Sequence, residues 1–141
     1  YHQLLLAPEL ADKRDWLHLK VAQLNLQMGK MDQARLEVRD LLVDEPRSTL
    51  RPQAYYLTGY SYYLEKRFDL ALFAFRQTAK DFPGTPLALR AQYFVADLLE
   101  EQGQMREALA AYTALRGKYP NPDIVEKRIK TLQARIRRGV R

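Results

Sequence analysis

The sequence has 141 residues, of which 47% are hydrophobic and 28% charged, with 6 glycines and no cysteine. This composition excludes a disordered or collagen-like chain, and a chain without cysteine has no disulfides, thiol nucleophiles or thiolate metal sites. The net charge of +6 arises in residues 125–141, where basic side chains far outnumber the single acid, so the remainder of the chain is balanced.

Residue types recur every 37 positions in three successive repeats. Each repeat has a small residue, an alanine, a larger side chain and a proline, at internal spacings of 12, 4 and 8. The members are Ala22, Ala34, Val38 and Pro46, then Gly59, Ala71, Phe75 and Pro83, then Ala96, Ala108, Tyr112 and Pro120. A fixed period of this size is typical of a stacked array, in which each repeat buries its apolar face against a neighbour.

In chain order, residues 1–8 are expected to be the end of a truncated preceding repeat, because Tyr1 precedes Ala22 by the same 21 positions as Val38 precedes Gly59. The chain is therefore interpreted as a fragment of a longer array. Three complete repeats, each of two helices, are predicted over residues 11–46, 48–83 and 85–120. A basic capping helix is predicted over residues 122–138.

The first helix of the first repeat alternates apolar and polar residues over 17–21 as a strand would. Apolar residues also recur there at i, i+4, i+7 and i+11, and the register of the repeat is kept, which favours a helix. This stripe consists of Leu17, Val21, Leu24 and Met28. A second stripe of Trp16, Leu19 and Leu26 is expected to contact the partner helix, the adjoining repeat or a groove.

Breaks between and after the helices are also predicted. Gly29 and Gly103 are expected to end first helices in the left-handed conformation, and Lys66 occupies the matching place in the second repeat. Asp32 and Asp69 are expected to cap second helices. Three prolines are expected to stop those helices, since proline lacks an amide hydrogen. They are Pro46, Pro83 and Pro120.

The last helix carries one apolar stripe, at Val125, Ile129, Leu132 and Ile136, and its other faces are polar. A helix with one apolar face can close an array against solvent.

The recurring pattern resembles the tetratricopeptide repeat (TPR), which usually spans 34 residues. The second repeat matches best, through Tyr55, Gly59, Tyr62, Ala71, Phe75 and Pro83. The resemblance implies an all-α fold, a right-handed superhelix of antiparallel helix pairs with a C-terminal capping helix. It also implies a non-enzymatic scaffold for protein–protein interaction. The linkers at 82–88 and 119–122 resemble those of bacterial envelope TPR proteins, which favours the periplasm or cell envelope, with the cytoplasm as the alternative.

Catalysis is not expected. The sequence has two histidines, His2 and His18, no glycine-rich phosphate loop and no pair of histidines at metal-ligand spacing. Both histidines are expected to have simple surface roles. We therefore expect no enzyme activity, small-molecule substrate, cofactor or metal site.

In TPR arrays the first helices line a concave groove. The resemblance to TPR arrays implies that the groove of this chain is lined by Trp16, Leu19, Gln23, Gln27, Tyr56, Tyr60, Tyr63, Arg90, Tyr93, Asp97 and Glu100. Tyrosine offers a large contact area with few rotatable bonds, which suits binding of a partner peptide or helix. The alternative is that these tyrosines pack between repeats.

The last helix forms a basic patch of Lys127, Arg128, Lys130, Arg135, Arg137 and Arg138. Clustered basic residues can bind nucleic acid or an anionic membrane surface through counterion release. No aromatic residue follows Tyr119, so a base-stacking platform is missing and nucleic acid is disfavoured. The simpler alternative is a solvated face of a capping helix. A further alternative function is a periplasmic module of an exopolysaccharide or pilus export machine that contacts a glycan.

Overall fold

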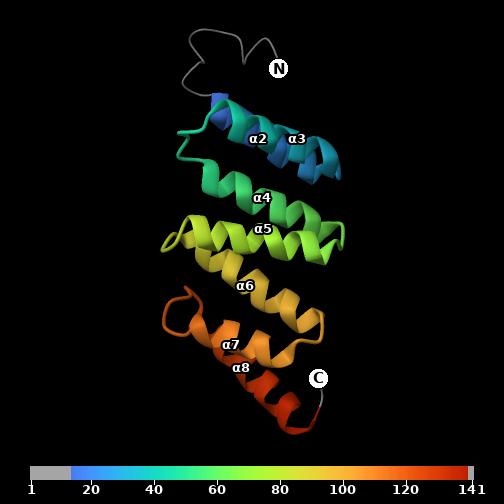
Figure 1. Ribbon diagram of the computed structural model, residues 1–141, viewed down its shortest axis with the longest axis vertical. Helices are drawn as coiled ribbons and strands as arrows, with labels where there is room; N and C mark the ends of the chain where they lie inside the picture. Colours follow the sequence, from blue (N-terminus) through green and yellow to red (C-terminus); the bar gives the residue numbers. More distant parts are fainter. Residues whose placement is uncertain (1–13, 140–141) are drawn as a thin grey trace. The chain divides into compact units, whose positions relative to one another are not determined.

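The computed structural model describes residues 14–139. All regular elements in this part of the chain are α-helices, in agreement with the expected fold class. They are α2 (Arg14–Gln27), α3 (Met31–Asp44), α4 (Arg51–Leu64), α5 (Phe68–Asp81), α6 (Pro86–Glu101), α7 (Met105–Ala114) and α8 (Pro122–Arg137) (Figure 1). The half-repeat expected at residues 1–8 lies outside the described residues. None of the described helices is both long enough and apolar enough to cross a bilayer.

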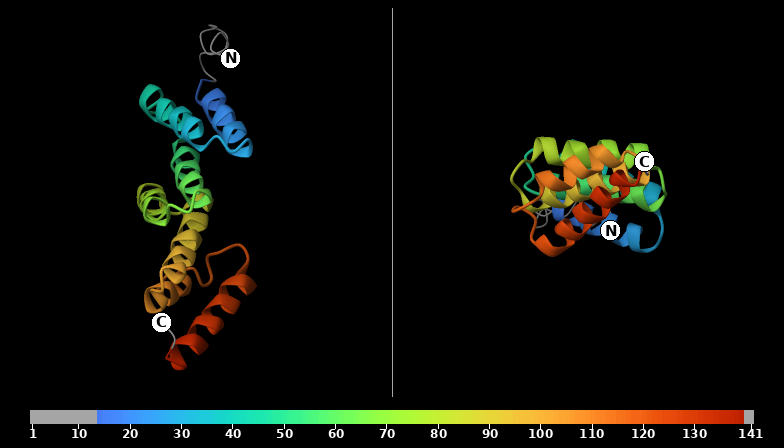
Figure 2. Two further views of the ribbon diagram at one scale, coloured as in Figure 1. Left: turned by 90° about the vertical axis from the view of Figure 1, so that its right-hand side faces the viewer. Right: turned by 90° about the horizontal axis from the view of Figure 1, so that it is seen from below.

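Contacts divide the chain into two units, Tyr1–Ala74 and Phe75–Arg141. In the first unit, α2 and α3 form a hairpin, and α4 packs against α3 and also touches α2 (Figure 2). The buried cluster consists of Leu19, Ala22, Ala34, Val38, Leu41 and Ala54. Half of these residues are alanines, which lets the helices approach closely without leaving voids.

In the second unit, α6 packs against α7, and α7 packs against α8. Phe75 is fully buried, and its ring stacks on that of Phe94 with 4.7 Å between centroids and 5° between planes. Tyr112, the equivalent residue of the third repeat, is also fully buried. The apolar stripe predicted for the last helix faces inward at its first three positions, Val125, Ile129 and Leu132.

Each of the three turns between paired helices passes through the left-handed region, as predicted. Gly29 has φ 77° and Gly103 has φ 82°, which glycine adopts without steric cost. Lys66 takes the same role with φ 61°, and it is the sole non-glycine residue with positive φ in the described part of the chain. A side chain at this φ strains the backbone.

The proline predictions hold at two of the three positions. Pro46 and Pro83 each follow the end of a helix, at Asp44 and Asp81, by two residues. The third prediction is wrong, because α7 ends at Ala114, well before Pro120. The chain leaves α7 through turns that include Gly117 at φ 79°, and glycine both weakens a helix and allows this conformation.

The cap of α3 differs from the sequence prediction. Asp32 lies in the first turn of α3, but no side chain caps that helix, and Asp32 instead accepts a bond from Arg35 at 2.6 Å. Two linker residues provide caps that the sequence analysis missed. Thr85 caps α6 and Asn121 caps α8, each accepting a hydrogen bond from a first-turn amide at 3.1 and 3.4 Å. A proline at the first helical position follows each cap.

The buried face of α2 is not the predicted stripe. Leu24 and Met28 are 55% and 60% exposed, whereas His18, Leu19 and Ala22 are buried. The prediction that His18 has a surface role is also wrong, because His18 is 6% exposed. His18 lies one helical turn before Ala22, so it shares the face packed on α3, where Glu37 accepts its hydrogen bond.

Candidate functional site

Three tyrosines lie on one side of α4, because they are separated by four and three residues. We call Tyr56, Tyr60 and Tyr63 the tyrosine face. All three are half-buried, and the rings of Tyr60 and Tyr63 stack with 6.4 Å between centroids and 12° between planes. The Tyr63 ring also contacts Phe68 of α5, at 6.1 Å. The rings are partly packed within the unit, and each keeps some exposed surface.

The groove positions predicted on α2 have different environments. Leu19 is 5% exposed and belongs to the core, so it is not available to a partner. Gln23 is half-buried, and Gln27 is exposed. Trp16 is also exposed, with the Lys20 amino group 5.7 Å from the centroid of its ring. Trp16 is therefore the large apolar side chain that this helix offers to solvent near its start.

Arg35 of α3 ties α4 to the first hairpin. Its guanidinium donates to Ser61 Oγ at 3.1 Å and pairs with Glu65 at 2.8 Å and Asp32 at 2.6 Å. The same group lies 4.4 Å from the centroid of the Tyr62 ring. Burial lowers the pKa of Arg35, but its bonds to Glu65 and Asp32 raise that pKa by more, so the guanidinium remains charged. Arg35 thus fixes the turns of α4 that carry the tyrosine face, a role that the sequence analysis did not identify.

Two acidic residues of α6 that were predicted to line the groove form ion pairs with two arginines of the predicted basic patch on α8. Arg128 donates to Asp97 at 2.5 Å and lies 3.8 Å from Glu100. Arg135 lies 3.4 Å from the other oxygen of Glu100. Asp97 and Glu100 are separated by one helical turn, so both face α8. These acids are therefore neutralised within the second unit, while Arg90, near the start of α6, remains exposed.

Tyr93 packs among aromatic rings of its own unit. Its ring meets Tyr112 edge-on at 5.4 Å and stacks on Tyr119 at 5.1 Å. Burial raises the pKa of both Tyr93 and Tyr112, and the Arg128 guanidinium lowers it in part. Burial lowers the pKa of Arg128, while Tyr112 and the two acids raise it, with a net increase. The Tyr93 ring thus packs within its own repeat, against Tyr112 and Tyr119.

The basic patch divides into two sets. Arg128 and Arg135 are held in ion pairs with α6. The exposed set consists of Lys127, Lys130, Arg137 and Arg138. The charge that α8 offers to an external anion is therefore smaller than the sequence suggested.

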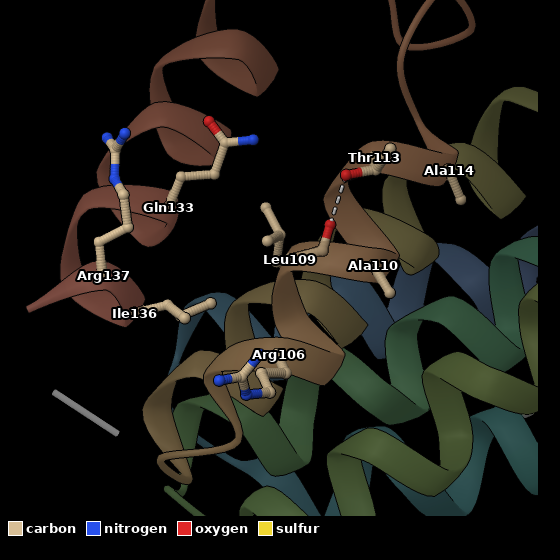
Figure 3. A pocket seen from close by; sticks show the side chains of 8 residues that line it. All are labelled: Arg106, Leu109, Ala110, Thr113, Ala114, Gln133, Ile136 and Arg137. Atoms are coloured by element: carbon tan, nitrogen blue, oxygen red, sulfur yellow. Dashed lines mark hydrogen bonds between the residues drawn. The ribbon is translucent and has the colours of Figure 1, made fainter. Parts of the chain in front are cut away.

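An open groove of about 930 Å³ lies between α7 and α8. Figure 3 shows Leu109 of α7 and Ile136 of α8 in this groove, with Arg106 and Arg137 nearby. The Thr113 hydroxyl donates to the Leu109 carbonyl at 2.7 Å, so its proton is already used within the helix. The groove can accommodate apolar side chains and offers guanidinium groups to an acidic neighbour.

A family model for the tetratricopeptide repeat matches residues 19–84 and again residues 67–121. No curated protein gives a significant match to the chain. The two matches together cover most of the sequence, and they include the helices that carry the tyrosine face and Tyr93. Repeats of this family generally mediate protein–protein interaction and are typically non-enzymatic. The chain therefore belongs to the tetratricopeptide-repeat family.

Proposed function

We propose that this protein is a scaffold that binds an extended or helical segment of a partner protein on the tyrosine face of α4, within a bacterial envelope assembly. The observation that carries the proposal is the set of half-buried rings at Tyr56, Tyr60 and Tyr63 on one helical face. The envelope setting is supported by the linker resemblance at residues 82–88 and 119–122.

Partial burial suits this role for an energetic reason. The stacking of Tyr60 on Tyr63 and the contact of Tyr63 with Phe68 already restrain these rings. Binding then costs less side-chain entropy than it would with freely rotating rings. Arg35 restrains the backbone that carries the rings, through Ser61 and Glu65. The face is thus preorganised for apolar and aromatic side chains of a partner.

The groove between α7 and α8 is a second candidate surface for the same function. Leu109 and Ile136 supply apolar area there, and Arg106 and Arg137 supply positive charge. An amphipathic helix with acidic residues beside its apolar face would complement this groove. The tyrosine face and this groove lie in different units, so separate variants can test them.

The test of the proposal starts with a photo-crosslinking residue at position 60 in cells, with position 73 as the matched control. Phe73 is 67% exposed and aromatic, and it lies on α5 outside the tyrosine face. We expect a crosslinked partner at position 60 and none at position 73. The identified partner segment is then titrated against purified protein.

Replacement of both Tyr60 and Tyr63 by alanine should weaken that affinity by at least about tenfold, because buried tyrosines commonly dominate binding energy. Circular dichroism must show that the variant remains folded. Phe73→Ala should leave the affinity unchanged. If the double variant still captures the partner, the tyrosine face is not the binding surface. If Leu109→Asp abolishes capture instead, the partner binds in the groove between α7 and α8.

Separate binding measurements test the glycan alternative and the anionic-surface alternative. Binding to purified cell-wall glycan in the absence of any protein partner would favour the export-machine alternative. Retention on acidic vesicles that falls steeply with salt, and falls further when Lys127 and Lys130 are replaced by glutamine, would favour a membrane surface. Neither result is expected if the tyrosine face binds a protein segment.

A further inference from the structure

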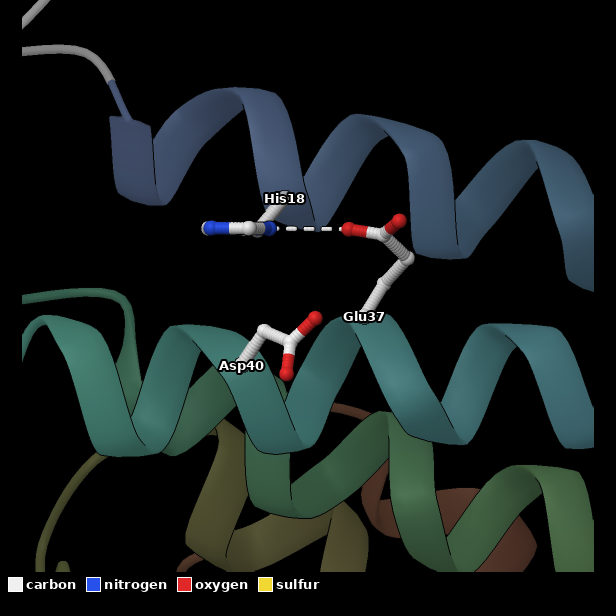
Figure 4. Close-up of side chains that lie close together, drawn as sticks. All are labelled: His18, Glu37 and Asp40. Atoms are coloured by element: carbon white, nitrogen blue, oxygen red, sulfur yellow. Dashed lines mark hydrogen bonds and ion pairs between the residues drawn. The ribbon is translucent and has the colours of Figure 1, made fainter. Parts of the chain in front are cut away.

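Three potential metal ligands converge between α2 and α3. They are His18 from α2 and Glu37 and Asp40 from α3, and one ligand atom of each lies within 4.8 Å of the others. Figure 4 shows both carboxylates directed from α3 toward the imidazole of His18. The sequence analysis excluded metal sites from the spacing of histidines alone, and therefore did not consider a single histidine with carboxylates of another helix.

The backbone brings these groups together for simple reasons. Glu37 and Asp40 are three residues apart, so their side chains leave the same side of α3. His18 lies on the buried face of α2, and its hairpin partner is α3. Each ligand thus sits on a packed helix, which restricts its movement more than a loop would.

The imidazole of His18 faces the carboxylates of α3, and a metal ion bound at Nδ1 would replace the proton that Nδ1 donates to Glu37. The side chain is 93% buried, and Nδ1 lies 2.8 Å from Glu37 Oε2. Among the described residues, the other ring nitrogen, Nε2, makes no hydrogen bond and lies 4.0 Å from Asp44 Oδ2. Histidines that bind metals commonly direct their second nitrogen to a carboxylate, which selects the tautomer and orients the ring. Asp44 is the nearby carboxylate for that role, and its exposed side chain would have to approach Nε2 from 4.0 Å to hydrogen-bond distance.

Three acidic side chains lie near the imidazole. Glu37 and Asp44 lie 2.8 and 4.0 Å from its two ring nitrogens, and Asp40, which completes the cluster, lies 3.8 Å from Arg39. The Arg39 side chain is 69% exposed, so solvent weakens that pair. A divalent cation between the imidazole and the carboxylates would be attracted by these negative charges.

We propose that His18 Nδ1, Glu37 and Asp40 bind one divalent transition-metal ion, with Zn²⁺ as the expected species. An imidazole with two carboxylates favours zinc over magnesium or calcium, which prefer oxygen ligands alone. Three protein ligands leave a position for water or for a side chain of a bound partner. The metal would clamp α2 to α3.

The test is a titration of the full chain, freed of metal with a chelator, with Zn²⁺ alone in a calorimeter. We expect saturation at one ion per chain. Glu37→Gln and Asp40→Asn should each weaken binding by at least about tenfold, since each removes a charged ligand with little change of shape. His2→Gln and Glu107→Gln are the controls, because they change the other histidine and an exposed acid of the second unit, and both should bind as the unchanged chain does.

Two further readouts separate a metal site from a simple ion pair. Zinc should raise the melting temperature of the unchanged chain and not that of Glu37→Gln. Cobalt(II) in place of zinc should give visible absorption bands that disappear in Asp40→Asn. No saturable binding, or binding unchanged in both ligand variants, would overturn the proposal and assign the cluster to a hydrogen-bonded ion pair. These outcomes do not depend on whether the tyrosine face binds a partner.

Discussion

Arg128 of α8 donates a hydrogen bond to Asp97 of α6 at 2.5 Å, across 31 positions of sequence. Arg128 belongs to the predicted basic patch, and Asp97 belongs to the predicted groove. Two surfaces that the sequence analysis treated as separate therefore neutralise each other within one unit. The pair also lies close to the aromatic cluster, since the Arg128 guanidinium is 5.8 Å from the centroid of the Tyr112 ring.

The first prediction concerns the coupling between Arg128 and Asp97. The variants Arg128→Met, Asp97→Asn and their combination should give a coupling free energy of about 1 kcal/mol in urea unfolding, because both side chains are partly shielded from water. The control is the cycle for Arg116 and Glu126, whose side chains are 52% and 41% exposed. The control coupling should be smaller. Equal coupling free energies in the two cycles would show that partial burial does not strengthen the Arg128–Asp97 pair.

The second prediction concerns the strained turn at Lys66. Lys66→Gly should stabilise the chain by about 1 kcal/mol, because glycine adopts φ 61° without a side-chain clash. Lys66→Ala is the matched control, since alanine removes the charge but keeps the clash, and little change is expected. Thermal unfolding measures both variants. A stabilisation of the same size in Lys66→Ala would mean that charge, and not backbone strain, is responsible.

The third prediction concerns the buried aromatic stack. Phe75→Ala should destabilise the chain by about 3–5 kcal/mol, because it removes a fully buried ring that stacks on Phe94. Phe73→Ala, two positions away, removes a ring that is 67% exposed and should change stability by less than about 0.5 kcal/mol. Chemical unfolding of both variants gives the comparison. Similar losses would contradict the burial of Phe75.

The fourth prediction concerns the arginine between α3 and α4. Arg35→Ala should lower the free energy of unfolding by about 2 kcal/mol, since it removes the partner that lies 2.8 Å from Glu65 and the donor to Ser61 and leaves Glu65 with the more distant Arg67. Arg35→Lys should not restore the loss, because an ammonium cannot reach several acceptors and the Tyr62 ring together. Arg39→Ala on the same helix is the control, and its effect should be small. Full rescue by lysine would mean that charge alone matters at position 35.

The fifth prediction concerns stability at high pH. Burial raises the pKa of Tyr112 and Tyr93 above the ordinary value of 10. The folded chain therefore holds these protons at a pH where the unfolded chain releases them. Stability is fully present below pH 10 and should fall as the pH rises above it.

Urea unfolding at pH 8 and pH 11 measures that loss, and Tyr112→Phe should reduce it. Absorbance at 295 nm should show late titration of these two tyrosines. Tyr60→Phe is the control, since Tyr60 lies on α4, outside the aromatic cluster of Tyr93 and Tyr112, and the loss of stability at high pH should remain. An undiminished loss in Tyr112→Phe would contradict the assignment to Tyr112.

The helical architecture was predictable because its signals are local. Helical spacing, the breaks at Gly29, Lys66 and Gly103, and the inward stripe that starts at Val125 depend on residues within a few turns of one another. The end of α7 was not predicted correctly, because the chain already turns at Gly117, which precedes Pro120. The buried face of α2 was also missed, since His18, Leu19 and Ala22 follow neither of the two apolar stripes and their burial depends on where α3 packs.

The sequence by itself determined the helix pairs and the family, because a fixed 37-residue period and backbone preferences are properties of the chain read in order. Only the tertiary structure decided which charged and polar groups are paired. His18 meets Glu37 across 19 positions, Arg35 meets Ser61 across 26, and Arg128 meets Asp97 across 31. Such pairs depend on how the helices pack against one another, and neither residue of a pair reveals its partner in the sequence.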